Sequence, residues 1–344
     1  MVMGTASTMA SIAEAMGMML PGGATIPAPD SARTRLAEET GRRAVAMVEE
    51  DLRPSRIVRR AAIENAIRVC VAIGGSTNGV VHLAAIAGRV GVDLPLDLWD
   101  RLSRETPMVA SMRPTGAFQM QELDEAGGIP AVMRELAPLL HGDAITVTGK
   151  SVGEQAEAAP ETRRRDVVAS VAKSFAPEGG LTVLTGNLAP RGAIIKHAAS
   201  TPALLQHRGP AIVFDSVEDM THRINDPDLP ATADSMLVLR NAGPVGGPGM
   251  PEAGMIPFPA RLLGAGVRDM VRISDARMSG TAYGTVVLHV APEATVGGPL
   301  AAVRDGDEIL LDVSARTITL EVADEEIARR VATSDAGNLM RKRE

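Results

Sequence analysis

The chain of 344 residues has few aromatic residues, one cysteine and no excess of basic residues. Aromatic residues make up 2% of it, and the formal net charge is −7. Because nucleic-acid surfaces combine basic groups with aromatic stacking platforms, we expect no nucleic-acid partner. Cys70 has no second cysteine with which to form a disulfide, which suits a reducing compartment. We therefore predict a soluble, cytoplasmic protein.

The sequence also lacks a long uninterrupted hydrophobic run. Residues 1–29 contain a single charged residue, Glu14, but no basic region precedes the apolar part. Six glycines and prolines interrupt the segment: Gly17, Pro21, Gly22, Gly23, Pro27 and Pro29. Neither a signal peptide nor a membrane anchor has this pattern. We expect a buried helix followed by a packed loop, and no membrane partner.

Helical patterns predominate before residue 150. Asp30 is placed to cap a helix that runs towards residue 50, and residues 61–73 have apolar side chains at helical spacing. Cys70 lies in this second helix, where we expect it to be buried as a small apolar side chain. Residues 76–89 predict a third helix.

Strand-like runs predominate after a polar segment at 153–165, which we interpret as a linker. The runs lie at residues 181–184, 193–195, 211–214, 236–239, 267–273, 285–290, 308–313 and 317–322, with short helices at 217–224 and 324–332. Glycine and proline mark most of the junctions. We predict an α/β chain with two domains, residues 1–160 and 161–344, of which the second is rich in β-structure.

A serine among glycines marks the first candidate reaction centre. Residues 271–285 read VRISDARMSGTAYGT, so Ser279 is followed at once by a glycine. Glycine leaves room for a substrate to approach the serine oxygen, and Asp275, Arg277 and Thr281 bring charge and a hydroxyl nearby. A Ser-Gly pair by itself is more often an ordinary turn.

A second candidate segment is rich in glycine and proline. Residues 241–252 read NAGPVGGPGMPE and follow a strand-like run, so the loop should lie at a strand end, where α/β proteins tend to bind ligands. Glu252 is then either an oxygen ligand for a hard cation or a solvated loop carboxylate.

Together these segments closely resemble the dihydroxy-acid dehydratase and phosphogluconate dehydratase family. The resemblance extends along nearly the whole chain, through segments at 2–9, 73–82, 186–190, 243–252, 275–284 and 289–299. Met278 and Tyr283 give the Ser279 segment the character of the sugar-acid (aldonate) branch. The resemblance implies the remainder of an α/β N-terminal domain followed by a barrel-like β domain, and a homo-oligomer for the complete protein.

The resemblance also implies site residues and cofactors. Ser279 matches the serine that acts as the base, and Glu252 matches one ligand of Mg²⁺. Thr281 either bonds a substrate hydroxyl or stabilises a turn, and Ser76, Thr77 and Asn78 either contact substrate or cap a helix. The family also uses an iron-sulfur cluster held by three cysteines, and this chain starts just after the position of the last one. We therefore expect a truncated dehydratase that is inactive alone and exposes apolar surface, with poor solubility.

Three functions remain open. The first is a dehydratase that converts a sugar acid to a 2-keto-3-deoxy acid. The second is a dihydroxy-acid dehydratase of branched-chain amino-acid synthesis, which would act on an apolar dihydroxy acid. The third is a non-catalytic protein that retains the fold. Met278 and Tyr283 favour the first.

Overall fold

The computed structural model describes residues 1–334, which divide into two compact units. One unit spans Met1–Leu181, and the other begins at Thr182. This division lies later than the boundary predicted at residue 160. The expected linker is wrong in its first part, because Val152–Ala158 forms helix α9. The Ser151 hydroxyl and the Glu154 carboxylate cap its N-terminus reciprocally, which explains why a polar sequence is helical here.

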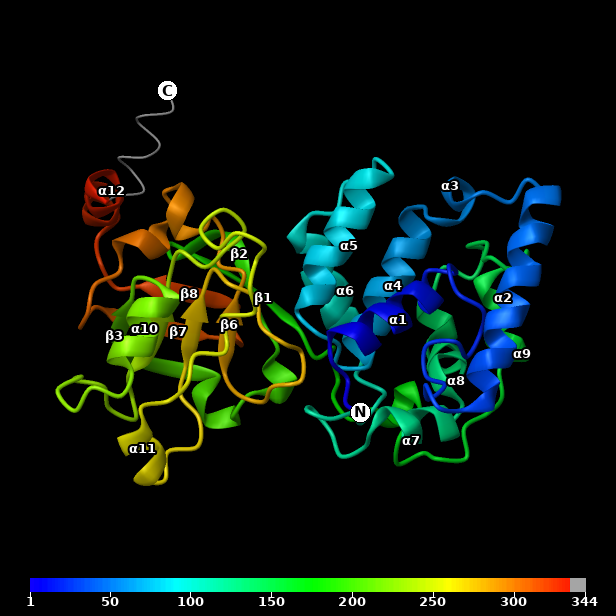
Figure 1. Cartoon of the computed structure of the whole chain (residues 1–344), viewed down its shortest axis with the longest axis horizontal. Coiled ribbons are helices and arrows are strands. Elements are labelled where there is room, and N and C mark those ends of the chain that lie inside the picture. The colour runs from blue at the N-terminus through cyan, green and yellow to red at the C-terminus, as the bar shows by residue number, and fades with distance from the viewer. Residues whose placement is uncertain (335–344) are drawn as a thin grey trace. The chain divides into compact units, whose positions relative to one another are not determined.

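The first unit is built mainly from helices (Figure 1). Besides α9 they are α1 (Thr5–Ala15), α2 (Ser31–Glu49), α3 (Pro54–Ile57), α4 (Arg60–Ala72), α5 (Asn78–Arg89), α6 (Leu96–Glu105), α7 (Met120–Glu125) and α8 (Gly128–Leu136). The Asp30 carboxylate accepts the N–H of Ala32, as expected for the cap of α2. Helix α4 lies in the core, and the predicted burial of Cys70 is confirmed.

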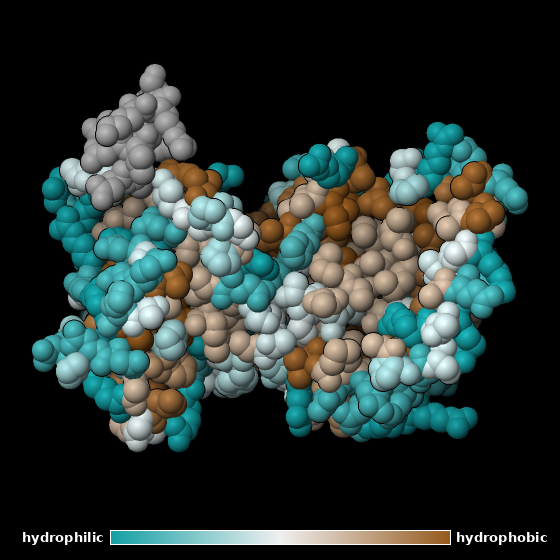
Figure 2. All heavy atoms as spheres, in the orientation of Figure 1, coloured by the Kyte–Doolittle hydropathy of each residue, from teal (hydrophilic) through white to brown (hydrophobic). Residues whose placement is uncertain are grey.

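Apolar side chains are exposed on parts of the first unit. None of the residues of α2 is buried, and Val45 and Val48 are 64% and 81% exposed. Figure 2 shows tan and brown residues over the region of α1 and α4 on the viewed face. Within residues 1–334, no helix combines the length and apolar character that crossing a membrane would require.

The second unit is a closed mixed barrel, which confirms the barrel-like β-rich half of the predicted α/β chain. Its strands are β1 (Thr182–Gly186), β2 (Ala189–Ile195), β3 (Gln206–Phe214), β4 (Met236–Leu239), β5 (Arg272–Ser274), β6 (Val286–Leu288), β7 (Glu308–Asp312) and β8 (Thr317–Leu320). Their order around the barrel is β1-β2-β6-β5-β4-β3-β7-β8. Three helices accompany them: α10 (Val217–Arg223), α11 (Ala260–Gly264) and α12 (Asp324–Thr333).

Four neighbouring strands of the barrel run parallel. Strand β4 pairs in parallel with β3 and with β5, and β5 pairs in parallel with β6. In this register Leu239, the last residue of β4, lies opposite Phe214 of β3 and Ser274 of β5. The chain therefore leaves all four strands at the same edge of the barrel, and the segments that follow them are brought together there.

Candidate functional site

Both segments that the sequence singled out start at this barrel edge. The glycine-rich loop follows β4, and the Ser279 segment follows β5, the adjacent parallel strand. Residues 289–294, which follow β6, join them. Three stretches that are far apart in the sequence thus form one site on the second unit.

The buried carboxylate of Asp275 connects these three stretches. It accepts the backbone N–H groups of Asn241 at 3.1 Å, Ala242 at 3.0 Å and Ala294 at 2.9 Å. Asp275 is 1% exposed, and its burial raises the pKa of the carboxyl, while the three N–H donors act in the opposite direction. Sequence reasoning noticed its charge but missed this anchoring role.

Glu293 binds the glycine-rich loop a few residues further along than Asp275 does. Its carboxylate accepts the N–H groups of Val245 and Gly246 at 2.9 to 3.1 Å. Gly243 passes so close that an added Cβ would lie 2.5 Å from the carboxylate, so the contact requires glycine. Glu293 was not among the predicted site residues, although an acid shortly after a strand-like run was a usable signal.

Arg277 links the Ser279 segment to Glu252. Its Nη1 lies 3.1 Å from Oε1 of Glu252, and its Nε donates to the carbonyl of Met250 at 2.6 Å. The Arg277 carbonyl in turn accepts the N–H of Gly254 at 2.8 Å. The side chain of Glu252 is 39% exposed, so this carboxylate lies beside the Ser279 segment and is open to solvent.

The Ser279 hydroxyl lies at the accessible part of the site. Its Oγ is 2.9 Å from Oγ1 of Thr281, and the Thr281 N–H points to the same oxygen at 3.5 Å. Ser279 is half-buried and Thr281 is exposed. Either hydroxyl can be the donor of the shorter bond; when Thr281 donates, both bonds end on the Ser279 oxygen and favour negative charge there.

A buried ion pair fixes the far end of the Ser279 segment. Arg272 and Asp269 are 1% and 4% exposed at their side chains, and they pair at 3.2 Å. The Asp269 carboxylate also accepts the N–H and the hydroxyl of Thr285, at 2.9 and 2.8 Å. The arginine stacks over the ring of Phe258. The loop that carries Ser279 is therefore fixed at Asp275 and at Thr285.

Ser76, Thr77 and Asn78 belong to the first unit, at the start of α5. All three are buried, with exposed fractions of 0%, 4% and 0%. The Asn78 side chain donates to the Thr5 hydroxyl at 2.8 Å, and the Ser76 N–H donates to the Thr8 hydroxyl at 2.9 Å. Thr5 and Thr8, whose hydroxyls accept these hydrogen bonds, were not among the residues predicted for the site. The N-termini of α1 and α5 thus share one polar cluster.

The described residues do not complete a metal site. Mg²⁺ prefers carboxylate and other oxygen ligands, and Glu252 offers such a group. Within residues 1–334, however, no three histidine, cysteine or acidic side chains gather as a metal site requires. An iron-sulfur cluster needs several thiolates, whereas this chain has one buried cysteine, Cys70. The residues present therefore do not fit a cluster.

Comparison with known proteins also divides the chain into two parts. The N-terminal sequence model of the dihydroxy-acid/6-phosphogluconate dehydratases matches residues 1–155, and the C-terminal model of the same family matches residues 166–343. These matches cover most of the chain. The two units and these matches together define the class of protein: the chain belongs to the dihydroxy-acid/6-phosphogluconate dehydratase family.

Individual relatives have different substrates in their names. The L-arabinonate dehydratase of Rhizobium leguminosarum bv. trifolii is 53% identical over 93% of this chain and 55% of its own length. The 6-deoxy-6-sulfo-D-gluconate dehydratase of Pseudomonas putida is 49% identical over 96% of this chain and 57% of its own. The dihydroxy-acid dehydratase of Ignicoccus hospitalis is 46% identical over 95% of this chain and 59% of its own length. The chain thus spans little more than half the length of these relatives.

Proposed function

We propose that the chain forms part of a hydro-lyase that removes water from a sugar acid to give a 2-keto-3-deoxy acid. The observation that carries the proposal is the position of Ser279. Its half-buried hydroxyl lies on a loop held at two fixed points, Asp275 and Thr285, and the same loop pairs through Arg277 with an accessible carboxylate, Glu252. The similarity to relatives named for arabinonate and sulfogluconate supports a sugar acid as the substrate.

Dehydration of a 2,3-dihydroxy acid requires a base for the weakly acidic proton beside the carboxylate. In the proposed reaction the Ser279 oxygen takes this proton. The hydroxyl and N–H of Thr281 supply hydrogen bonds that favour the deprotonated serine. Thr281 is exposed beside it and can bond a substrate hydroxyl in exchange. The C2–H electron pair forms the C2=C3 double bond as the C3 hydroxyl leaves, and the hydroxide combines with the proton taken from C2 to give water. The resulting enol then tautomerises to the keto acid.

The metals belong to the proposal only for the complete protein. The family resemblance implies an iron-sulfur cluster and Mg²⁺, with Glu252 as one Mg²⁺ ligand, in a homo-oligomer of the cytoplasm. For Ser76, Thr77 and Asn78, contact with substrate remains a proposal, and their bonds to α1 give them a structural role as well.

A chimera tests the proposed reaction. Residues 1–344 replace the corresponding part of the L-arabinonate dehydratase from Rhizobium leguminosarum, and the product is measured in a keto-acid assay after anaerobic reconstitution with iron, sulfide and Mg²⁺. We expect turnover of L-arabinonate, loss of turnover in Ser279→Ala, and no loss in Ser314→Ala, an exposed serine outside the site. Conversion of an apolar dihydroxy acid alone would assign the chain to branched-chain synthesis. No turnover of any acid by the reconstituted chimera would favour the non-catalytic alternative.

A further inference from the structure

A cavity in the barrel unit has no part in the proposed reaction. It has a volume of about 570 Å³, within the range typical of small-molecule sites. Neither Ser279 nor Glu252 lines it. Its charged lining consists of Arg240, Arg304 and Arg330 against one carboxylate, Asp215. The wall thus carries a surplus of positive charge, in a chain whose net charge is −7.

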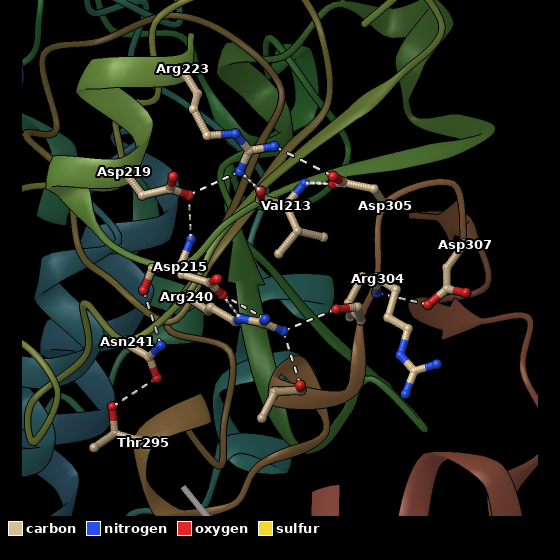
Figure 3. Close-up of polar contacts among 12 residues, drawn as sticks. Val213, Asp215, Asp219, Arg223, Arg240, Asn241, Thr295, Arg304, Asp305 and Asp307 are labelled. Carbon is tan, nitrogen blue, oxygen red and sulfur yellow. Dashed lines mark hydrogen bonds and ion pairs between the residues drawn. The ribbon is translucent and has the colours of Figure 1, made fainter. Parts of the chain in front are cut away.

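Arg240 is held rigidly in the wall of this cavity. Its Nε donates to Asp215 at 2.6 Å, and its Nη1 donates to the carbonyls of Ala301 and Val303, both at 2.9 Å (Figure 3). The Arg240 side chain is 19% exposed. These contacts fix the orientation of the guanidinium, so it contributes a positive charge at a defined place.

Arg330, from α12, is fixed in a similar way but retains free donors. Its Nε donates to Glu326 at 2.8 Å, and its Nη1 donates to Asp307 at 2.5 Å and to the carbonyl of Ala302 at 3.2 Å. Its side chain is 13% exposed. Among the residues that the structure describes, Nη2 of Arg330 has no hydrogen-bond partner.

The Arg304 guanidinium is a cation of the cavity that has no partner within residues 1–334. Its backbone N–H donates to Asp307 at 2.8 Å, but within residues 1–334 its guanidinium makes no hydrogen bond or ion pair, and Figure 3 draws none. The nearby acids already have partners. Asp305 accepts the N–H of Val213 at 2.6 Å and pairs with Arg223 at 3.4 Å, and Asp307 binds Arg330.

We propose that this cavity binds a small metabolite through an oxyanion, a phosphate or a carboxylate, that is held by Arg304 and by Nη2 of Arg330. Guanidinium groups bind such anions through paired, charge-assisted hydrogen bonds, and a preformed orientation reduces the entropy cost of binding. Arg240 adds a fixed positive charge to the same wall. The site is distinct from the Ser279 site, and it does not depend on the proposed dehydration.

Its wall nevertheless includes a residue of the glycine-rich loop. The side-chain oxygen of Asn241 accepts the hydroxyl of Thr295, which also lines the cavity, and the Asn241 N–H donates to Asp275. An anion bound here should therefore stabilise the start of that loop together with the barrel.

Titration calorimetry and thermal unfolding of the full chain test the site. The ligands are inorganic phosphate and malonate, and sodium chloride at matched ionic strength is the control for general screening. We expect saturable binding of at least one of the two and a rise in Tm that chloride does not reproduce; the tighter ligand identifies the anionic group. Binding of neither, or an equal effect of chloride, would overturn the proposal.

Two matched variants locate the binding. Arg304→Gln should weaken binding about tenfold or more and leave Tm without ligand unchanged, because the Arg304 guanidinium makes no contact within the described residues. Arg191→Gln removes another exposed arginine that is not part of the cavity lining, and it should bind like the unmodified chain. If both variants lose binding equally, or neither does, the cavity is not the site.

Discussion

The carboxylate of Asp275 accepts the backbone N–H of Ala242 at 3.0 Å and so joins the segments that follow two adjacent parallel strands, β4 and β5. Glu252 lies ten residues after this contact on one segment, and Ser279 lies four residues after Asp275 on the other. Because the contact is buried, water does not compete with it. The contact therefore holds together the starts of the two segments that carry the proposed base, Ser279, and the proposed Mg²⁺ ligand, Glu252.

Replacement of Asp275 by asparagine should destabilise this edge of the barrel. The amide keeps one acceptor oxygen for three N–H donors, so at least one buried donor loses its partner, at a cost of about 1–3 kcal/mol. Urea unfolding should report this loss, and limited proteolysis should cut the glycine-rich loop faster. Asp234→Asn, at an exposed position, is the control. Equal stability of the two variants would contradict the anchoring role.

Asp269→Asn should have a larger effect. It removes the charge that compensates Arg272, which is 1% exposed, and an uncompensated buried charge costs about 3–5 kcal/mol. The double variant Asp269→Asn/Arg272→Met should unfold at higher denaturant concentration than the single variant, because it removes the unpaired cation. A double variant that is less stable than the single one would show that the pair is not the source of the loss.

Stability should also depend on pH through Glu14. This buried carboxyl accepts the N–H groups of Gly22 and Ala24, and burial raises its pKa to about 7 from an ordinary 4.5. The folded chain therefore binds a proton more tightly than the unfolded chain. The stabilisation from this proton is fully present below pH 4.5 and disappears as pH rises to about 7, a change of about 3 kcal/mol.

The corresponding variant is Glu14→Gln, which cannot ionise. Between pH 5 and pH 8 the unfolding free energy of the unmodified chain should fall more steeply than that of the variant. Parallel curves for the two proteins would show that Glu14 does not carry the pH dependence. Circular dichroism during urea titration at each pH measures both curves.

A fourth prediction concerns the polar cluster at the start of α5. In Gly75→Ala the new Cβ would lie 2.7 Å from Sγ of Cys70 and 2.9 Å from its carbonyl oxygen, so the backbone before Ser76 must shift. We expect a loss of about 1–3 kcal/mol, as for other overpacked cores. Gly88 lies inside α5, where an added Cβ meets no neighbour within 4 Å, so Gly88→Ala should instead stabilise the helix by about 0.5–1 kcal/mol. Equal Tm values for the two variants would contradict this account.

The sequence by itself determined the local elements and the chemical character of the site. Apolar periodicity placed α4, β4 and most other elements within a few residues, because a buried face imposes its spacing on the chain. The glycine that follows Ser279 marked a candidate reaction centre, since it leaves room beside the serine oxygen. The first part of the predicted linker is helical because the cap on α9, made by Ser151 and Glu154, outweighed the polar composition.

Only the tertiary structure decided which of these elements meet. The four neighbouring strands β3, β4, β5 and β6 pair in parallel and so place Asp275 and Glu293 at one barrel edge. No local sequence pattern specifies that pairing. The same holds for the cavity of Arg240, Arg304 and Arg330, whose residues come from separate segments. Local propensity acts over a few residues, whereas barrel closure is set by the packing of side chains distant in the sequence. For that reason the sequence indicated the candidate residues, and only the tertiary structure decided how they lie relative to one another.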